Sequence, residues 1–231
     1  MAMKLGKVVP FGRSLDEYVH MFDLTPGDLR GNILGVADGP ASFNAELSQR
    51  PGNVTSVDPL YEFSADAIKA QFYRVVDNII DQVKASPDDW VWSYHDSPEK
   101  LRNARINVIE TFAKDFVKGK IAGRYITGAL PRLPFKDGRF DLALCSHFLF
   151  LYSGHFDAGF HYASLREMLR VAGEVRVFPL VTLMADKSLH LDTVSRRLVD
   201  EGFHVSVRKS GYELQRGGNE MMVISRSPSR S

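Results

Sequence analysis

Three short segments of this sequence carry residues that could bind a ligand and act on it, and each follows an apolar run typical of a β-strand. The first, residues 37–41 (ADGPA), is a tight turn of small residues, where backbone can approach a ligand closely and a following helix presents free N–H groups. Asp58 follows the second run, where a carboxylate suits acceptance of ribose hydroxyls. Residues 146–148 follow a later run, and His147 among them has an ordinary pKa near neutrality, which suits a general base.

The glycine pattern of the first segment argues against a dinucleotide ligand. A pyrophosphate presses onto its turn and needs Gly-x-Gly-x-x-Gly, and here only Gly39 is a glycine at the positions of that motif. Asp58 lies about twenty positions further on, where an acceptor for ribose hydroxyls is expected. A nucleoside without pyrophosphate still needs such an acceptor. The residues therefore disfavour NAD and suit a nucleoside ligand.

Taken in order, the segments resemble the motifs of the class I S-adenosylmethionine-dependent methyltransferases. The resemblance rests on residues 33–43 (ILGVADGPASF), on Val57-Asp58 and on residues 133–147. The last of these contains LPFKDGRFD, which is similar to the family's passage into its fourth strand and is the most specific motif. Residues 167–175 also resemble the family's helix leading into its fifth strand. The resemblance covers roughly residues 31–225 and implies a methyltransferase with S-adenosylmethionine as its cofactor.

The resemblance also implies roles for individual residues. The methionine and ribose part of the cofactor would lie against Ala37, Asp38, Gly39 and Pro40. Asp58 would accept the ribose hydroxyls, and the adenine would be flanked by Ala129 and Leu130. The reactive methyl group would lie beside Ser146 and His147.

Four further residues are candidates for contacts with the substrate. From their position in an N-terminal segment, Arg13 and Tyr18 are expected to close over the cofactor carboxylate or the substrate. Tyr152 and His155 follow His147 closely and are the other two candidates.

The first motif departs from the family pattern at three positions. Gly35 stands where the family usually has an acidic residue, and Ala37 and Ala41 stand where it usually has glycine. Alanine allows close approach when its φ is negative, but Ala37 would be strained in a left-handed conformation. These departures leave open a relative that keeps the fold and binds the cofactor or a partner without turnover.

Methyl transfer from a sulfonium needs chiefly in-line placement of donor and nucleophile, so a strong catalytic group is not required. An acceptor that carries a proton does need a base, and His147 is the best candidate by position and by its pKa. The alternative is a hydrogen-bonded histidine that orders a loop. His155 and His161 are six residues apart with Asp157 between them, which is not a standard ligand spacing, so no metal site is predicted.

Alternating strand and helix patterns must position these residues. Apolar runs predict strands at 32–36, 53–57, 124–127, 140–145, 174–178, 203–208, 212–215 and 221–224, with a hairpin turn at 217–219. Helical spacing and caps predict helices within 14–30, with Ser14 and Glu17 at capping-box spacing, and at 42–49, 64–85, 98–118, 156–170 and 189–201. In a sheet of this kind, ligands bind at the carboxyl ends of the strands.

The order of these elements predicts one α/β domain with a mostly parallel sheet, flanking helices and a C-terminal antiparallel hairpin. The resemblance implies that this sheet is Rossmann-like and seven-stranded. We expect an N-terminal helical lid over 1–30, a methyltransferase domain over 31–225 and a disordered tail over 226–231. A helical insertion at about 60–120 departs from the minimal fold. Its linker, residues 88–95, holds three aromatics and a histidine, which we interpret as core joining the helices rather than as a ligand contact.

Composition limits the partners that this chain is expected to have. Lys and Arg number 29 against 28 Asp and Glu, so no excess positive charge favours a phosphate backbone, and no nucleic-acid partner is expected. The single cysteine, Cys145, lies in an apolar run and is expected to be a buried, inert thiol. No apolar stretch is long enough to cross a membrane, so we expect a cytoplasmic protein.

The sequence thus predicts methyl transfer to a small-molecule acceptor, without specifying the acceptor or the oligomeric state. A methyltransferase for RNA or protein is the alternative, and it would need a basic stripe beside the pocket. Glu110 and Asp115 dilute the one candidate stripe, for which a solvated helix face is the preferred interpretation. That stripe comprises Arg102, Arg105, Lys114, Lys118, Lys120 and Arg124.

Overall fold

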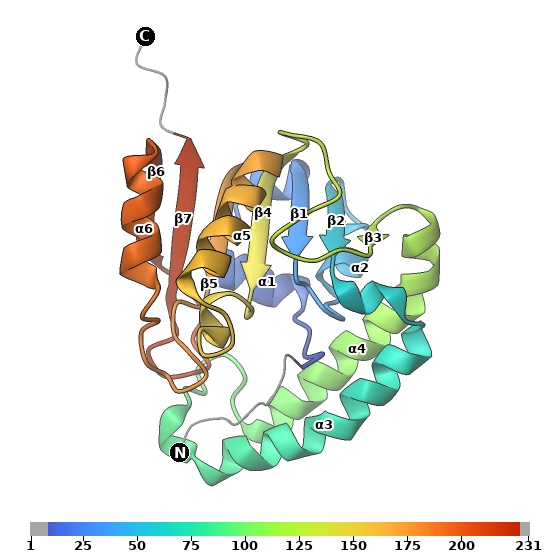
Figure 1. Cartoon of the computed structure of the whole chain (residues 1–231). Helices are drawn as coiled ribbons and strands as arrows, with labels where there is room; N and C mark the ends of the chain where they lie inside the picture. Colours follow the sequence, from blue (N-terminus) through green and yellow to red (C-terminus); the bar gives the residue numbers. More distant parts are fainter. Residues whose placement is uncertain (1–8, 227–231) are drawn as a thin grey trace.

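A seven-stranded sheet forms the centre of the protein in a computed structural model, which describes residues 9–226 (Figure 1). Its strand order is β3-β2-β1-β4-β5-β7-β6. Neighbours from β3 to β5 are parallel, whereas β7 runs antiparallel to both β5 and β6. The predicted mostly parallel sheet with an antiparallel C-terminal pair is therefore confirmed. The strands are β1 (Asn32–Val36), β2 (Asn53–Val57), β3 (Tyr125–Ile126), β4 (Phe140–Ser146), β5 (Ala172–Phe178), β6 (Phe203–Lys209) and β7 (Glu220–Arg226).

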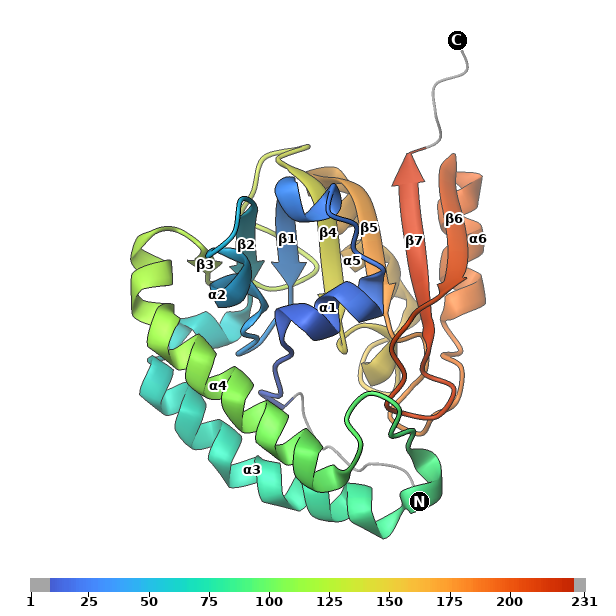
Figure 2. The ribbon, with the colours of Figure 1, turned by 180° about the vertical axis from the view of Figure 1, so that it is seen from behind.

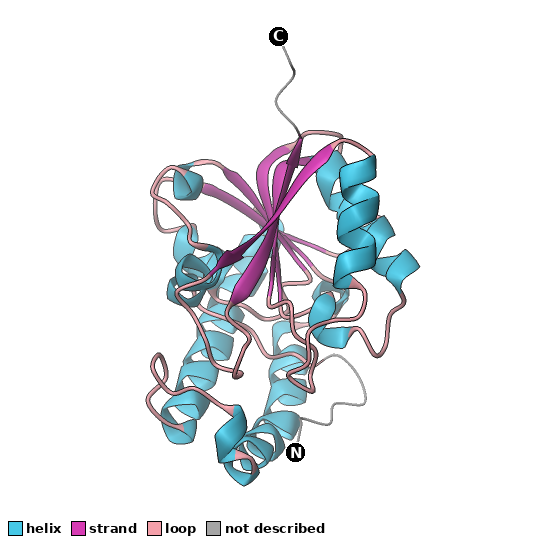
Figure 3. Ribbon diagram, turned by 90° about the vertical axis from the view of Figure 1, so that its left-hand side faces the viewer, coloured by secondary structure: helices cyan, strands magenta, loops and turns pink. Residues whose placement is uncertain are grey.

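Helices cover both faces of the sheet (Figure 3). Successive residues of a strand point to opposite faces, so Leu142 and Leu144 pack in one core cluster and Ala143 and Cys145 in the other. The first cluster includes residues of α1 (Leu15–Phe22), α2 (Phe43–Leu47), α3 (Ala65–Ala85) and α4 (Pro98–Ile121). The second includes residues of α5 (Ala158–Val171) and α6 (Leu191–Asp200).

The paired helices α3 and α4 are the feature that extends the molecule beyond its sheet. They lie side by side and reach past the carboxyl ends of the strands (Figures 1 and 2). Both begin at a serine whose side chain accepts a backbone N–H, Ser64 for α3 and Ser97 for α4. The predicted insertion therefore stands over the edge of the sheet at which ligands are expected.

Helix α1 belongs to the core. It begins with the predicted capping box, in which the Ser14 hydroxyl accepts from the backbone of Glu17 and the Glu17 carboxylate accepts from the backbone of Ser14. Its apolar side packs in the first core cluster, where Tyr18, Met21 and Phe22 are fully buried. The predicted lid remains a prediction, and residues 1–8 of it lie outside the described part of the chain.

A buried ion pair joins α1 to α4. Glu17 and Arg105 are each only 1% exposed, and the carboxylate oxygens accept from Arg105 Nη1 at 2.7 Å and from Nη2 at 2.6 Å. Although burial opposes ionisation, the Arg105 guanidinium holds the pKa of Glu17 well below its usual value. The Tyr212 hydroxyl, from the loop between β6 and β7, donates to the same carboxylate at 3.1 Å. One carboxylate therefore ties together three segments that are distant in sequence.

The C-terminal end corrects two predictions. Residues 212–215 are not a strand, and the turn at 217–219 does not join β6 to β7 directly, because a loop over 210–219 separates them. That loop pairs with the linker between α3 and α4: Val91 N donates to Leu214 O at 2.8 Å, and Gln215 forms a bridge with Trp90. Strand β7 includes Arg226, the first residue of the predicted tail, and residues 227–231 lie outside the described residues.

Two smaller expectations concern the single cysteine and membrane-spanning helices. Cys145 is free and fully buried, and burial raises the pKa of its thiol to about 12, which fits an inert thiol. Within residues 9–226, no helix has the length and apolarity to cross a membrane.

Replacing Glu17 by alanine is expected to lower the free energy of unfolding by about 3–5 kcal/mol, because Arg105 would remain buried without its counterion. Chemical denaturation measures this loss. Asp16→Ala, on the exposed side of the same helix, is the control and is expected to cost about 1 kcal/mol or less. Equal losses in the two variants would contradict the assigned importance of the buried pair.

Candidate functional site

Two cavities lie at the carboxyl ends of the central strands. The larger has a volume of about 420 Å³ and is lined by residues that follow β1, β2 and β4. The smaller has a volume of about 90 Å³ and lies against residues of α3, the linker 88–95 and the loop 210–219. Val9, Phe11, Arg13 and His147 line both. The two cavities are therefore adjacent, with these four residues at their junction.

The larger cavity brings together the three segments singled out in the sequence. All but one of the predicted cofactor-binding residues line it, and so does Tyr18 from α1. The exception is Pro40, whose carbonyl oxygen packs against Gly12, 2.3 Å from where a Cβ on that glycine would stand. The residues that line it as predicted are Ala37, Asp38, Gly39, Asp58, Ala129, Leu130, Ser146 and His147.

Asp58 is held rigidly at the carboxyl end of β2. Its Oδ2 accepts from Gly39 N at 2.8 Å and its Oδ1 accepts from Leu60 N at 2.8 Å. A carboxylate offers about four acceptor positions, so two remain beyond those used by the backbone. Burial raises the pKa of Asp58 to about 6. The side chain can thus accept further hydroxyl donors when it is ionised.

Asp38 supplies a second carboxyl group in the wall, at an unexpected place. Its side chain is buried and accepts from the Tyr18 hydroxyl and from Ser56 Oγ, both at 2.6 Å. Burial raises its pKa to about 6. A Cβ added to Gly35 would stand 1.9 Å from Asp38 Oδ2, so the Asp38 carboxyl fills the space that a side chain at position 35 would occupy. A side chain at position 35 would therefore collide with the Asp38 carboxyl, so the glycine there makes room for it.

The turn after β1 has the left-handed backbone that small residues favour. Ala37 and Gly39 both have a φ of 54°. A Cβ on Gly39 would meet nothing within 4 Å, so the cost of another residue there comes from its backbone alone. Ala37 carries the strain expected of a non-glycine residue in this conformation, and its N–H donates to Val57 O at 2.9 Å.

His147 stands between the two cavities as a half-buried, neutral side chain. Burial lowers its pKa well below 6.5, and the charges of Arg13 and Arg105 act in the same direction. Its Nδ1 lies 2.8 Å from Ser146 Oγ, and its backbone N–H donates to Phe178 O at 2.7 Å with a φ of 53°. A neutral imidazole at this junction can accept a proton, although its lowered pKa makes it a weak base.

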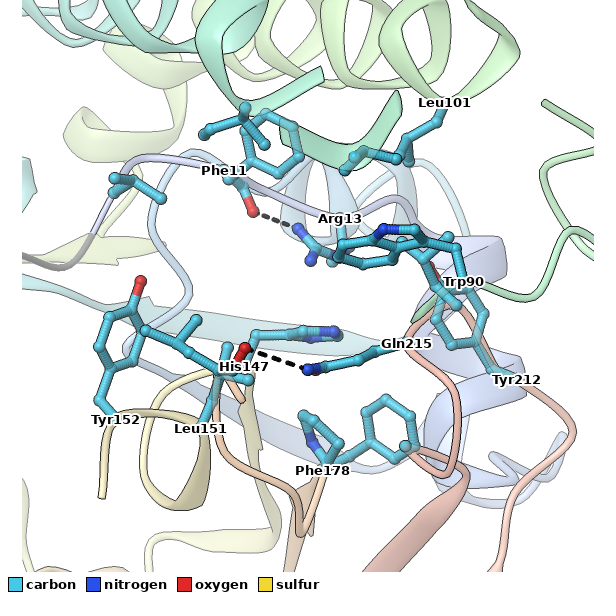
Figure 4. A pocket seen from close by; sticks show the side chains of 17 residues that line it. Phe11, Arg13, Trp90, Leu101, His147, Leu151, Tyr152, Phe178, Tyr212 and Gln215 are labelled. Atoms are coloured by element: carbon cyan, nitrogen blue, oxygen red, sulfur yellow. Dashed lines mark hydrogen bonds between the residues drawn. The ribbon is translucent and has the colours of Figure 1, made fainter. Parts of the chain in front are cut away.

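The smaller cavity has aromatic and aliphatic walls with few polar groups (Figure 4). Trp90, Phe178 and Tyr212 line it, and Gln215 is fixed by donating to the carbonyl of Thr182 at 3.1 Å. Trp90 also belongs to the core, so the linker 88–95 contributes to both the core and a cavity wall. Apart from the aromatic content of this linker, the sequence held no signal for these residues, because they come from three distant segments.

Comparisons with known proteins bear on the family and the fold. No protein-family profile matches the chain. Over 225 residues, the chain is 30% identical to the uncharacterized protein MJ0045 of Methanocaldococcus jannaschii, and this alignment covers 97% of the chain and 99% of that protein. The chain belongs to the family of this archaeal protein.

Nearly all of the solved structures with a similar fold are methyltransferases. The structure of a mitomycin 7-O-methyltransferase matches 92% of this chain and 54% of its own, with a TM-score of 0.50 and 13% identity. A magnesium protoporphyrin IX methyltransferase from Synechocystis PCC 6803, solved with bound S-adenosylmethionine, matches 92% of this chain and 78% of its own, with a TM-score of 0.47 and 16% identity. A methyltransferase from Aquifex aeolicus matches 92% of this chain and 89% of its own, with a TM-score of 0.47 and 14% identity. The chain therefore has the fold of the class I S-adenosylmethionine-dependent methyltransferases.

The remaining substrate candidates divide between the cavity walls and the surface. Arg13 lines both cavities and Tyr152 lines the smaller one. His155 is exposed and lines neither, because it lies in the turn before α5 with its ring packed beside Tyr152. Both ring nitrogens of His161 face backbone oxygens, those of Asp157 and Leu149. Among residues 9–226, no group of three or more His, Cys, Asp or Glu side chains could hold a metal ion.

Three of the six cations of the candidate basic stripe are paired with acids. Arg105 is buried on Glu17, while Arg102 pairs with Asp77 at 2.7 Å and Arg124 with Asp115 at 2.7 Å. Acidic partners neutralise these three arginines, and Arg105 faces the core rather than solvent. The positive face that an RNA substrate would need is therefore interrupted on α4.

Exchanging Ala37 for glycine is expected to raise the free energy of unfolding by about 1 kcal/mol, because the left-handed backbone is strained for alanine and not for glycine. Ala41→Gly is the matched control: Ala41 is buried, its φ is not in the left-handed region, and glycine there is expected to cost about 1 kcal/mol. Urea denaturation of both variants tests the contrast. Loss of stability in Ala37→Gly would refute the assigned strain.

Proposed function

We propose that the protein binds S-adenosylmethionine in the larger cavity and transfers its methyl group to a small molecule in the smaller cavity. The observation that carries the proposal is the convergence of Asp58, the open turn at Gly39 and the pair Ser146-His147 on one cavity at the carboxyl ends of β1, β2 and β4. Its volume of about 420 Å³ is within the range of small-molecule sites.

The residues of the larger cavity fit a nucleoside cofactor. Asp58 has acceptor capacity left for two ribose hydroxyls, and the turn at Gly39 has open space above its backbone. Ala129 and Leu130 are proposed to flank the adenine. When bound, S-adenosylmethionine would supply an electrophilic methyl group on a sulfonium.

The protein's own contribution is proposed to be placement and exclusion of water. His147 lines both cavities, so it is proposed to lie beside the transferred methyl group and to accept the proton of an acceptor that carries one. When the Ser146 hydroxyl donates to Met21 Sδ, from which it lies 3.8 Å, it accepts from Nδ1–H of His147 and leaves Nε2 free as the base.

Calorimetric titration with S-adenosylmethionine, S-adenosylhomocysteine and NAD tests the cofactor. Saturable binding of the first two without NAD is the expected result, since only one position of the dinucleotide motif is glycine. Binding of NAD alone, or of none of the three, would overturn the proposal. Binding of the first two without methyl transfer to any small molecule in an acceptor screen would instead indicate a module that binds the cofactor without turnover.

The variant Asp58→Ala is expected to weaken S-adenosylhomocysteine binding by about tenfold to a hundredfold, because hydrogen bonds to a charged group are lost. Glu62→Ala, an exposed acid four residues along the chain, is the control and should bind normally. Thermal melting of both variants separates loss of the ligand contact from loss of the turn that Asp58 supports. Unchanged affinity in a folded Asp58→Ala variant would refute the assigned role.

Binding of S-adenosylhomocysteine is expected to weaken on acidification. Asp58 must be ionised to accept hydroxyls, and burial raises its pKa to about 6, so affinity is close to full above about pH 7, about half at pH 6 and lower still below it. Between pH 7.5 and pH 5 the dissociation constant should rise about tenfold for one such group, and more if Asp38 also contributes. Calorimetry across this range measures the change, which should be smaller in Asp58→Asn. A flat profile in the unmodified protein would contradict the role of an ionised Asp58.

A further inference from the structure

Arg13 is a buried cation at the junction of the two cavities. Its side chain is 8% exposed and lines both cavities. Its Nη1 donates to the carbonyl oxygens of Phe11 and Gly12, whereas its Nε has no hydrogen-bond partner among the residues that the structure describes. A guanidinium has five N–H donors, so most of its capacity is unused.

The charges around Arg13 do not balance. Glu17 is the carboxylate nearest to it, with Oε1 3.8 Å from Arg13 Nε, but both oxygens of Glu17 already accept from Arg105. Two guanidinium groups thus share one carboxylate. Burial lowers the pKa values of His95 and His147, so neither adds a charge at neutral pH, and Glu17 is the only carboxylate among the groups that shift the pKa of Arg13. Within residues 9–226, one positive charge of this pair of arginines therefore remains buried without a counterion of its own.

Burying a charge without a counterion costs free energy, and an anion bound beside the charge would offset that cost. The Arg13 guanidinium lies between Phe11 and Trp90, across the cavity from His147 and Gln215 (Figure 4). Burial, together with Arg105, lowers the pKa of Arg13 to about 10, so it is still charged at neutral pH. An anion that enters either cavity would meet donors that the protein leaves unused.

We propose that Arg13 binds a carboxylate at the junction of the two cavities. The planar fork of a guanidinium matches a carboxylate with two parallel hydrogen bonds. That carboxylate can come from two sources, the amino-acid end of the cofactor or an acid group on the acceptor. In the second case the aromatic walls of the smaller cavity, Phe11, Trp90 and Phe178, suit a flat, apolar acid as the acceptor. The assignment of sources rests on the proposed function, whereas the carboxylate site itself does not.

Calorimetry with four probes distinguishes the sources. S-adenosylhomocysteine carries the amino-acid carboxylate, and 5′-methylthioadenosine is the matching nucleoside without it. Benzoate and benzyl alcohol form the corresponding acid and neutral pair for the smaller cavity, and are titrated into the free protein and into protein saturated with S-adenosylhomocysteine. The variants are Arg13→Gln and Arg13→Lys, with Arg196→Gln on the exposed side of α6 as the control.

Arg13→Gln is expected to weaken the binding of one of the two acids by about tenfold to a hundredfold. The affinities of both neutral probes are expected to stay within about twofold of those of the unmodified protein. Loss of S-adenosylhomocysteine binding alone assigns the carboxylate to the cofactor, and loss of benzoate binding alone assigns it to the acceptor. Arg13→Lys keeps the charge but not the fork, so it is expected to weaken the same acid less; it also serves if the glutamine variant does not fold. Unchanged affinity for both acids in the folded variants would overturn the proposal.

Failure of the proposed function gives a different pattern. In that case the unmodified protein would bind neither S-adenosylhomocysteine nor 5′-methylthioadenosine. Benzoate binding to the free protein, and its dependence on Arg13, would still decide whether the carboxylate site exists. Absence of benzoate binding together with Arg13-independent nucleoside binding would overturn the carboxylate site while leaving the cofactor proposal intact.

Discussion

The ion pair between Glu17 and Arg105 is the contact on which both cavities depend. Glu17 caps α1 from within, and the same carboxylate receives Arg105 from α4 and Tyr212 from the loop 210–219. These segments carry the walls of the cavities: α1 brings Tyr18 to Asp38, and the loop brings Tyr212 and Gln215 to the smaller cavity. Removing one partner of a buried pair of this kind is strongly destabilising, because the other charge is then left buried and unpaired.

Backbone strain is concentrated in the wall of the larger cavity. Three residues in the wall, Ala37, Gly39 and His147, have left-handed backbone, which packed surroundings must hold in place. Asp38 folds back against Gly35 because only a glycine leaves room for its carboxyl. Close backbone approach at the larger cavity is thus obtained with one glycine in the turn, where a regular motif would use several.

Electrostatics divide the two cavities. Two carboxyl groups with raised pKa values, Asp38 and Asp58, line only the larger cavity, whereas Arg13 lines both cavities and the walls of the smaller one are mostly apolar. The electrically neutral His147 lies between them. The carboxyl groups of the larger cavity therefore favour hydroxyl donors, and the buried cation of Arg13 lies where the two cavities meet.

Local patterns in the sequence determined the elements and the edge of the sheet that holds the site. Apolar runs and caps predicted β1, β2, α3 and the capping box of α1, because these depend on neighbours within a few residues. Parallel strands also bring their carboxyl ends together, so Asp58 and His147 could be placed in one cavity in advance.

Long-range packing decided the rest. Trp90, Tyr212 and Gln215 meet in the smaller cavity through contacts between distant segments, and residues 212–215 form a loop because their partners are in the linker 88–95 and in α1. The buried charge of Arg13 likewise emerges only in the folded chain, because a sequence with a net charge of +1 does not show which of its charges lack a partner.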